Sequence, residues 1–294
     1  MRFNNYLEEA TIKKSYKGTT TSARTYKDHG YKKPRSADSY LSEAIKLVGT
    51  HCRDILNFYR KQAGRYSEYI LRGIPGTSAG FRVTDPSAKS RASAYADFNY
   101  YTLLINNLPS WATYPKREII CSTDLDKASN YGETYVVFPY DGAKLGICPG
   151  SDIFISFDVF GSLRQFNKII NKLVYYVTHK TSTINSWRTL SGFLEKVDID
   201  RFADFVGMGD FGDLDTGDVV DDMYDAWLKV PKKTLFAFIN DHLLEPQKNN
   251  FRLVTHIPGM NELPEDREIW TDSKCVMVHE TNINEFMKEF DDEI

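Results

Sequence analysis

Helix-forming sequence stands between two blocks of short strand-like segments, and this order is the strongest constraint on how the chain can fold. Seven apolar residues recur at helical spacing between positions 162 and 177, which predicts one amphipathic helix. They are Leu163, Phe166, Ile169, Ile170, Leu173, Val174 and Val177. Further helical patterns follow at 191–206, 219–229 and 235–244. We therefore expect a helical insertion at about 160–250, between the parts of the chain that form sheet.

Short apolar segments with brief turns between them indicate strands on both sides of this insertion. They lie at 69–74, 117–124, 134–139, 144–148, 251–255 and 275–278. Such spacing favours a mixed or antiparallel sheet over a series of βαβ units. The predicted fold class is α+β, with a single domain at 39–294 that follows an N-terminal arm at 1–38.

The chain has 294 residues, of which 41% are hydrophobic and 26% are charged, as in an ordinary soluble globular protein. Its formal net charge of −3 offers no global basic field for duplex DNA. The charge is uneven, because 12–35 carries eight Lys or Arg residues against one acid, whereas 195–225 is rich in aspartate. Tyrosines interleave the basic residues. One interpretation is that the arm binds a single-stranded nucleic acid, with its basic residues on the phosphates and its tyrosines stacked on the bases. The alternative is a solvated or partner-bound segment.

Four cysteines are scattered without a Cys-x-x-Cys spacing, which argues against a zinc site or a disulfide framework and fits a reducing cytosol. The N-terminus has no apolar signal-peptide region. No apolar run approaches the roughly 18 residues of a membrane span. We expect a cytoplasmic protein that needs no metal and does not bind a membrane.

Two acidic residues, spaced two apart, precede the last strand-like segment. Asp266 and Glu268 would project from the same face of an extended segment, with Arg267 on the other face. Two carboxylates on one wall of a cleft suit chemistry in which positive charge develops on a sugar ring as its leaving group departs. The alternative is an exposed acidic turn before a hairpin.

Two further segments place polar groups at strand ends. Arg72 and Gly73 end one strand, where an arginine can hold a phosphate and a glycine lets a ligand approach the backbone. The alternative is a surface arginine before a turn. Ser122 and Thr123 end a second strand, directly before a short helix that Gly132 closes. Ser122 is alternatively a plain N-cap of that helix.

The order of Arg72, then Ser122-Thr123, then Glu268 resembles the R-S-E class of ADP-ribosyltransferases. The resemblance covers mainly residues 66–155 and 250–280. It implies a split pair of mainly antiparallel β-sheets that form a cleft for NAD⁺, with the helical stretch as an insertion. It also implies NAD⁺ as the co-substrate and no metal.

The strand–helix element at 122–131, with Ala128 and Tyr131, is similar to the element that carries the family's middle motif. Residues 267–278 are similar to the segment that carries its catalytic glutamate. The sequence departs from the family at two positions. Asp124 stands in place of the third-position serine, and Asp266 stands where a longer Glu or Gln is usual.

The resemblance implies a role for each cofactor-binding residue. Arg72 would hold the diphosphate or the adjacent ribose, and Gly73 would bind the nicotinamide amide. Ser122 would position the glutamate, and Thr123 would shape the ribose side of the pocket. Tyr131 would either stack near the nicotinamide ribose or fill the core.

The same resemblance assigns the catalytic roles to the two acids. Glu268 would hydrogen-bond the ribose 2′-hydroxyl and stabilise the oxocarbenium-like state as nicotinamide leaves. Asp266 would orient or deprotonate the acceptor. Because aspartate reaches less far than glutamate, we expect a nucleic-acid acceptor, such as RNA, rather than an arginine side chain of a protein.

The expected function is therefore mono-ADP-ribosyl transfer from NAD⁺ to a macromolecular acceptor. The expected context is an intracellular toxin of a toxin–antitoxin or phage-defence system, or a phage effector, with an antitoxin or other neutralising protein as partner. Two alternatives stay open at this point. One is an NAD⁺ glycohydrolase, and the other is a non-catalytic binding or structural subunit.

Overall fold

The structure is a computed structural model that describes residues 37–63, 68–75, 80–86, 100–157, 163–179, 184, 186–209 and 214–292. The arm expected at 1–38 lies outside the described residues except for its last two positions, which begin a helix. In the described part of the chain, no helix has the length and apolar composition needed to cross a bilayer.

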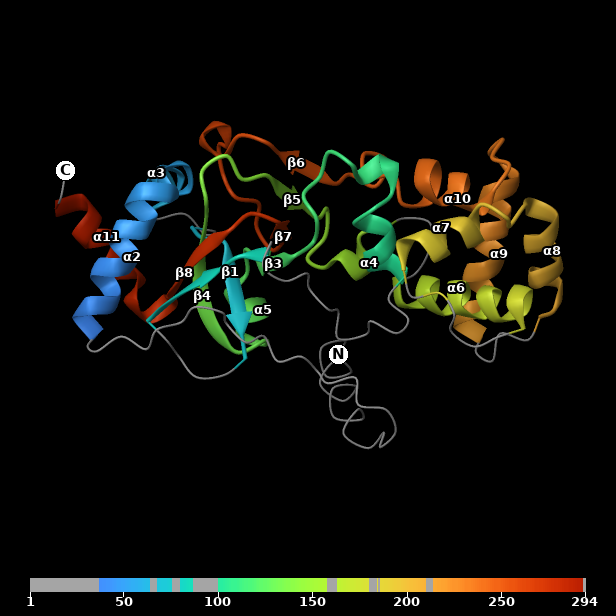
Figure 1. Ribbon diagram of the computed structural model, residues 1–294, viewed down its shortest axis with the longest axis horizontal. Helices are drawn as coiled ribbons and strands as arrows, with labels where there is room; N and C mark the ends of the chain where they lie inside the picture. Colours follow the sequence, from blue (N-terminus) through green and yellow to red (C-terminus); the bar gives the residue numbers. More distant parts are fainter. Residues whose placement is uncertain are drawn as a thin grey trace. The chain divides into compact units, whose positions relative to one another are not determined.

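Eight strands of the described chain form one sheet, and each neighbouring pair in it is antiparallel (Figure 1). The strands are β1 (Leu71–Ile74), β2 (Phe81–Thr84), β3 (Ile119–Ser122), β4 (Glu133–Pro139), β5 (Leu145–Ile147), β6 (Arg252–Val254), β7 (Glu268–Thr271) and β8 (Cys275–His279). Their order across the sheet is β2-β8-β4-β1-β3-β7-β5-β6. The predicted α+β class is therefore confirmed.

The sheet is continuous, whereas the sequence predicted two separate sheets. A single residue pair, Leu71 opposite Ser122, joins β1 to β3. Every other neighbouring pair of strands is joined by two to five residue pairs. We call this narrow link the β1–β3 seam. Four strands lie on each side of it.

The insertion is helical in the residues that the structure describes. Its α-helices are α6 (Leu163–Thr178), α7 (Trp187–Leu194), α8 (Ile199–Gly207), α9 (Leu214–Leu228) and α10 (Leu235–Phe238). Helix α6 occupies the positions where the spacing predicted a helix, and six of its seven predicted apolar residues are fully buried. The insertion and α4 (Tyr100–Ile105) enclose a hydrophobic core that reaches the sheet at Trp270.

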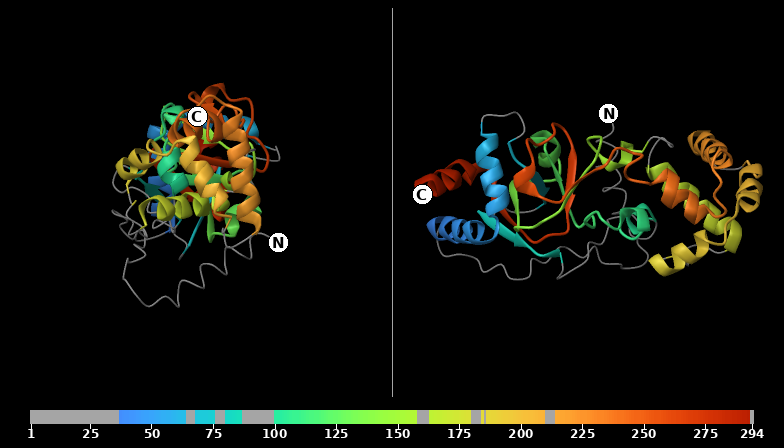
Figure 2. Two further views of the ribbon diagram at one scale, coloured as in Figure 1. Left: turned by 90° about the vertical axis from the view of Figure 1, so that its right-hand side faces the viewer. Right: turned by 90° about the horizontal axis from the view of Figure 1, so that it is seen from above.

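A second core lies between the sheet and the helices α2 (Ala37–His51), α3 (Arg53–Gln62) and α11 (Ile283–Asp292). Figures 1 and 2 show these helices and the insertion at opposite sides of the sheet. The ring of Phe138 on β4 lies 5.3 Å from the ring of Phe286 on α11. Tyr59 on α3 donates a hydrogen bond of 2.6 Å to the carbonyl of Val137. The two helices therefore fix β4 in place.

Shorter helical turns complete the described chain. They are α5 (Leu125–Ser129), η4 (Pro109–Trp111), η5 (Ile153–Ile155), the π-helical turn η6 (Ile239–Leu243), η7 (Ile257–Gly259) and η8 (Glu280–Asn282). Of these, α5 and η5 lie beside the predicted site. Helix α5 directly follows β3, and η5 follows β5.

Candidate functional site

The three segments that the sequence singled out meet at the centre of the sheet. Strands β1, β3 and β7 are immediate neighbours. Leu71 lies opposite Ser122 across the β1–β3 seam, and Ser122 lies opposite Glu268 in the next ladder. The structure therefore brings together three stretches that are far apart in the sequence.

The side chains of these strands do not all share one face of the sheet. Residues directly opposite each other on antiparallel strands project to the same side, so Ser122 and Glu268 share a face with Leu71. Arg72 is the next residue after Leu71 and therefore projects from the other face. There its Nη1 donates to the carbonyl of Ile120 at 3.2 Å. Burial raises the pKa of Cys121 to about 12, and the positive charge of Arg72 partly offsets that rise.

Glu268 forms a buried ion pair with Arg117, just before β3. Oε1 of Glu268 accepts from Nη2 of Arg117, and Oε2 accepts from the backbone N–H of Ile153 at 3.2 Å. Glu268 is 8% exposed and Arg117 is 2% exposed. The guanidinium carbon lies 5.9 Å from the ring centroid of Tyr101 and 5.7 Å from that of Trp270. The pair is thus shielded from water by aromatic rings.

The charge of Arg117 depends on its partner. Burial acts to lower the pKa of Arg117, but the adjacent Glu268 carboxylate raises it above the usual value of an arginine. The ion pair therefore favours the charged form of Arg117. Nε of Arg117 is buried and has no hydrogen-bond partner among the described residues. Burying a cation with one unused hydrogen-bond donor lowers the stability of the fold. Such groups are typical of functional sites.

A second carboxylate, that of Asp152, accepts a hydrogen bond from the same short helical turn, η5, as Glu268 does. Oδ1 of Asp152 accepts from the N–H of Phe154 at 2.9 Å, and Glu268 accepts from the N–H of the preceding Ile153. Burial and the negative charge of Glu268 raise the pKa of Asp152 to about 6. Arg117 and Lys127 partly offset the rise. Two carboxylates therefore adjoin one short helical turn, and the pKa of one of them, Asp152, is raised.

Asp266 and Glu268 do not project from one extended segment as predicted. Asp266 has a φ of 49°, in the left-handed region, and β7 begins only at Glu268. The two-residue rule for extended chain therefore does not apply between them. The Asp266 carboxylate pairs instead with Nζ of Lys127 on α5 and is half exposed. Asp266 therefore lies in a turn, as in the alternative interpretation of this segment, whereas Glu268 is buried in β7.

Thr123 fastens the end of β3 to the segment before β7. Its hydroxyl donates to the carbonyl of Pro264 at 2.7 Å and accepts from the N–H of Arg267 at 3.0 Å. Ser122 accepts through Oγ from the N–H of Asp124 at 3.0 Å. Asp124, rather than Ser122, is the N-cap of α5, because its side chain accepts from the N–H of Lys127. Ser122 is therefore not the plain N-cap of the alternative interpretation.

Gly73 and Tyr131 lie next to each other where α5 meets β1. A Cβ atom on Gly73 would lie 1.9 Å from the backbone oxygen of Ala128, so only glycine lets α5 pack this closely. That same Cβ would lie 2.9 Å from Cβ of Tyr131. Tyr131 is 47% exposed, so it does not fill the core. Helix α5 ends at Ser129 with Asn130 as its C-cap, so Gly132, with a φ of 127°, lies beyond the helix and is not the C-cap that the sequence predicted.

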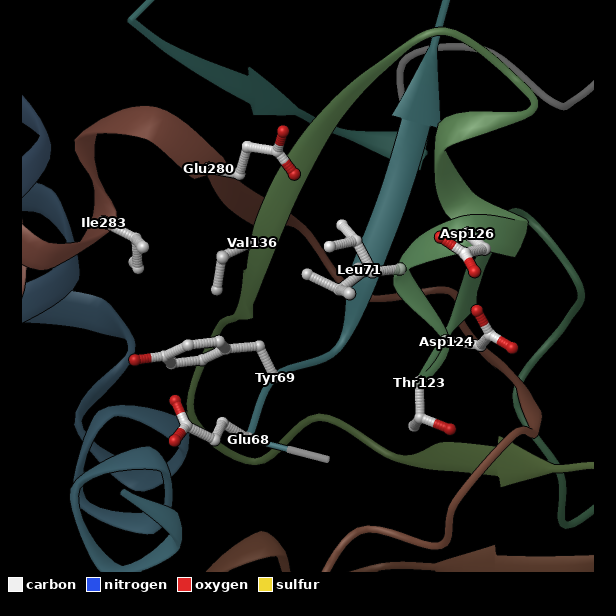
Figure 3. Close-up of a pocket in the computed structure, with 10 residues that line it drawn as sticks. Glu68, Tyr69, Leu71, Thr123, Asp124, Asp126, Val136, Glu280 and Ile283 are labelled. Atoms are coloured by element: carbon white, nitrogen blue, oxygen red, sulfur yellow. The ribbon is translucent and has the colours of Figure 1, made fainter. Parts of the chain in front are cut away.

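A cleft of about 540 Å³ opens on the Leu71 side of the sheet (Figure 3). Leu71, Leu125, Val136 and Ile283 provide the apolar lining. The polar and aromatic lining residues are Glu68, Tyr69, Thr123, Asp124, Asp126 and Glu280. Of the predicted site residues, only Thr123 belongs to this lining. The lining contains four acids and no Lys or Arg among the described residues, so it suits a positively charged group better than a diphosphate.

Comparisons of the chain with protein-family models, with curated proteins and with solved structures found no match. The candidate site therefore depends on the geometry and on the sequence resemblance alone.

Sequence reasoning missed three charged residues of the site, namely Arg117, Lys127 and Asp152. Arg117 begins a strand-like segment, but nothing local indicated that it would be buried. Asp152 follows the turn-forming pair Pro149-Gly150 and precedes an apolar run, which is the one available signal for a capping carboxylate. Lys127 was assigned only to the short helix.

Proposed function

We propose that this chain is an ADP-ribosyltransferase, which cleaves NAD⁺ and transfers ADP-ribose to a macromolecular acceptor. The observation that carries the proposal is the register in which Ser122 lies opposite Glu268, beside the strand of Arg72 and Gly73. An Arg strand, a Ser-Thr strand and a Glu strand are thus neighbours in the order that the sequence resemblance implies. No metal is part of this proposal.

The proposed chemistry gives Glu268 the central role. As nicotinamide leaves, positive charge develops on the ribose, and the carboxylate stabilises it. Arg117 orients the Glu268 carboxylate through the buried ion pair, and Thr123 holds the chain that leads into β7. To reach the ribose 2′-hydroxyl, Oε2 exchanges its hydrogen bond from Ile153 for one from the substrate.

Arg72 contributes from the other face of the sheet. In this proposal the diphosphate crosses the sheet at the β1–β3 seam, where only one residue pair joins the two strands. The guanidinium then exchanges the carbonyl of Ile120 for phosphate oxygens, which bind a planar fork more strongly. Tyr131, half exposed beside Gly73, stacks on the nicotinamide ribose.

The acceptor in this proposal is a protein that carries a positively charged group. The acidic cleft begins at Thr123, the residue after Ser122, and its four carboxylates repel phosphate groups. A nucleic-acid acceptor is the competing outcome, in which the basic residues at 12–35 would bind the phosphates. An intracellular toxin or phage effector, restrained by a neutralising protein, remains the proposed context.

The test is incubation with NAD⁺ labelled on the adenylate phosphate and with separate pools of protein, RNA and DNA. Wild type is compared with Glu268→Gln and with Glu195→Gln, a matched change at an exposed glutamate. We expect label in the protein pool with wild type and Glu195→Gln, and at least a hundredfold less with Glu268→Gln. Thermal melting confirms that each variant is folded. Equal labelling by all three proteins would remove Glu268 from catalysis.

An NAD⁺ glycohydrolase is the second candidate, and one contact favours it. Asp266, the acid assigned to the acceptor, is already paired with Lys127, which leaves water as the simplest nucleophile. This candidate predicts nicotinamide release at the same rate with and without macromolecules. A non-catalytic subunit predicts no nicotinamide release at all.

A further inference from the structure

Asp152 has no part in the reaction as proposed so far, although it adjoins Glu268. The two carboxylates accept hydrogen bonds from consecutive backbone N–H groups of η5, those of Phe154 and Ile153. Asp152 is partly exposed, whereas Glu268 is buried. Of the two carboxylates, Asp152 is therefore the more accessible to a group that arrives from solvent.

The charges around Asp152 come from four different parts of the fold. Glu268 on β7 raises the pKa of Asp152, whereas Arg117 and Lys127 lower it. Asp152 in turn raises the pKa of Cys148, which follows β5. Each of those two cations already has its own ion pair, with Glu268 and Asp266 respectively. Among the described residues, Asp152 has no ion-pair partner.

The two carboxylates are therefore suited to different tasks. Glu268 has its counter-ion in Arg117, which holds the carboxylate in one orientation. Asp152, without a cation of its own, is able to exchange a proton. Paired carboxyl groups whose surroundings separate their proton affinities are the usual arrangement when one group stabilises charge and the other transfers a proton.

We propose that Asp152 is the general base that accepts the proton of the incoming nucleophile, an inference that rests on the proposed cleavage of NAD⁺. The bond between C1′ and the nicotinamide nitrogen breaks, and its electron pair leaves with nicotinamide, which departs neutral. A lone pair on the acceptor oxygen or nitrogen, or on water, forms the new bond to C1′. The proton that this atom loses goes to the Asp152 carboxylate, which becomes a carboxylic acid.

The proton affinity of Asp152 agrees with this role. A base works best when its pKa lies near the working pH, because it is then ionised and still binds a proton. Burial and Glu268 raise the pKa of Asp152 to about 6, which meets both conditions near neutrality. The rate is then expected to rise as the pH increases through about 6.

The test compares Asp152→Asn with wild type in NAD⁺ cleavage from pH 4.5 to 8.5. Asparagine keeps an oxygen for the N–H of Phe154 but cannot take up the proton. Because a general base contributes roughly a hundredfold or more, we expect kcat to fall by about that factor. We expect KM for NAD⁺ to stay within about twofold and the rising limb near pH 6 to disappear.

Asp198→Asn is the matched control, since Asp198 also caps a helix by accepting a backbone N–H, that of Arg201 on α8. It is expected to leave kcat and the pH profile unchanged. Asp152→Glu is the second variant, and it keeps a titrating carboxyl group. It is expected to retain more activity than Asp152→Asn and a rising limb, and an inactive but folded Asp152→Glu with no limb would count against the proposal.

The outcomes separate this inference from the proposed function. Absence of NAD⁺ cleavage by wild type overturns both. If wild type cleaves NAD⁺ and Glu268→Gln does not, but Asp152→Asn keeps the wild-type kcat and pH limb, only the role of Asp152 is overturned. The same holds if Asp152→Asn raises KM and leaves kcat unchanged, because that result indicates a purely structural role.

Discussion

Ser122 and Glu268 lie directly opposite each other in the ladder between β3 and β7. Their side chains project from the same face, and the Glu268 carboxylate is then held by Arg117 and by the N–H of Ile153. The glutamate therefore has a fixed orientation before any ligand binds, which is what electrostatic catalysis requires of a charged group.

Removal of one member of the Arg117–Glu268 pair is expected to destabilise the protein strongly. Arg117→Met leaves a buried carboxylate without its counter-ion, a loss of about 3–5 kcal/mol in the free energy of unfolding. The double variant Arg117→Met/Glu268→Leu should recover most of that loss, because neither charge is then left unpaired. Urea titrations measure both values.

A second ion pair offers the control for that experiment. Lys232 and Asp241 pair at a partly exposed position, and Lys232→Met is expected to cost less than about 1 kcal/mol. Similar losses for Arg117→Met and Lys232→Met would show that burial does not set the strength of the first pair.

Asp152 is expected to make the protein less stable at neutral pH than at acidic pH. Its pKa is about 6 in the fold and about 3.9 in an unfolded chain, so the folded state binds the extra proton between those values. The stabilisation from that proton is complete below about pH 4 and is lost as the pH rises through about 6. It amounts to at most about 3 kcal/mol.

Asp152→Asn isolates this effect, because asparagine does not titrate. The variant is expected to be more stable than wild type at pH 7.5 and to approach wild type at pH 4. Denaturant midpoints across this range measure the difference. Parallel pH curves for the two proteins would mean that Asp152 does not take up a proton in this window.

Gly73→Ala is expected to destabilise the contact between β1 and α5. The added methyl group would lie 1.9 Å from the backbone oxygen of Ala128, so the helix must move away, at a cost of about 1–3 kcal/mol. Gly192→Ala is the control, because nothing lies within 4 Å of the added atom and alanine favours the α7 helix. Thermal melting should give changes of opposite sign for the two variants.

The cysteines are expected to be unreactive in the native protein. All four are buried, and burial raises the pKa of Cys52 and of Cys121 to about 12 and that of Cys148 and Cys275 well above the usual range. Thiolates are the reactive form, so an aromatic disulfide reagent at pH 8 should find no thiol. In guanidinium chloride it should find four. Rapid reaction of one native thiol would reveal local opening around it.

Features that depend on local spacing could be predicted from the sequence. The apolar period of α6 and the strands at the centre of the sheet both follow from residues within a few positions. The convergence of the Arg72, Ser122 and Glu268 strands was predicted through the resemblance. The structure places those strands side by side.

Features that depend on distant partners could not be predicted. The face from which Arg72 projects is set by the pairing of Leu71 with Ser122, which no local pattern encodes. The sequence predicted extended backbone at Asp266, but its φ is positive, so this residue lies in a turn before β7. The burial of Arg117 depends on rings from α4 and β7, and the pKa of Asp152 depends on the same long-range packing.

The β1–β3 seam makes the sheet uneven in its resistance to local opening. One residue pair joins the two groups of four strands, whereas β4 and β8 share five pairs. Amide protons of Leu71 and Ser122 should consequently exchange with deuterium sooner than those in the middle of β4, through fluctuations that leave both hydrophobic cores intact. A long ligand would then need to break the pairing of only one residue pair, Leu71 with Ser122, to contact both faces of the sheet.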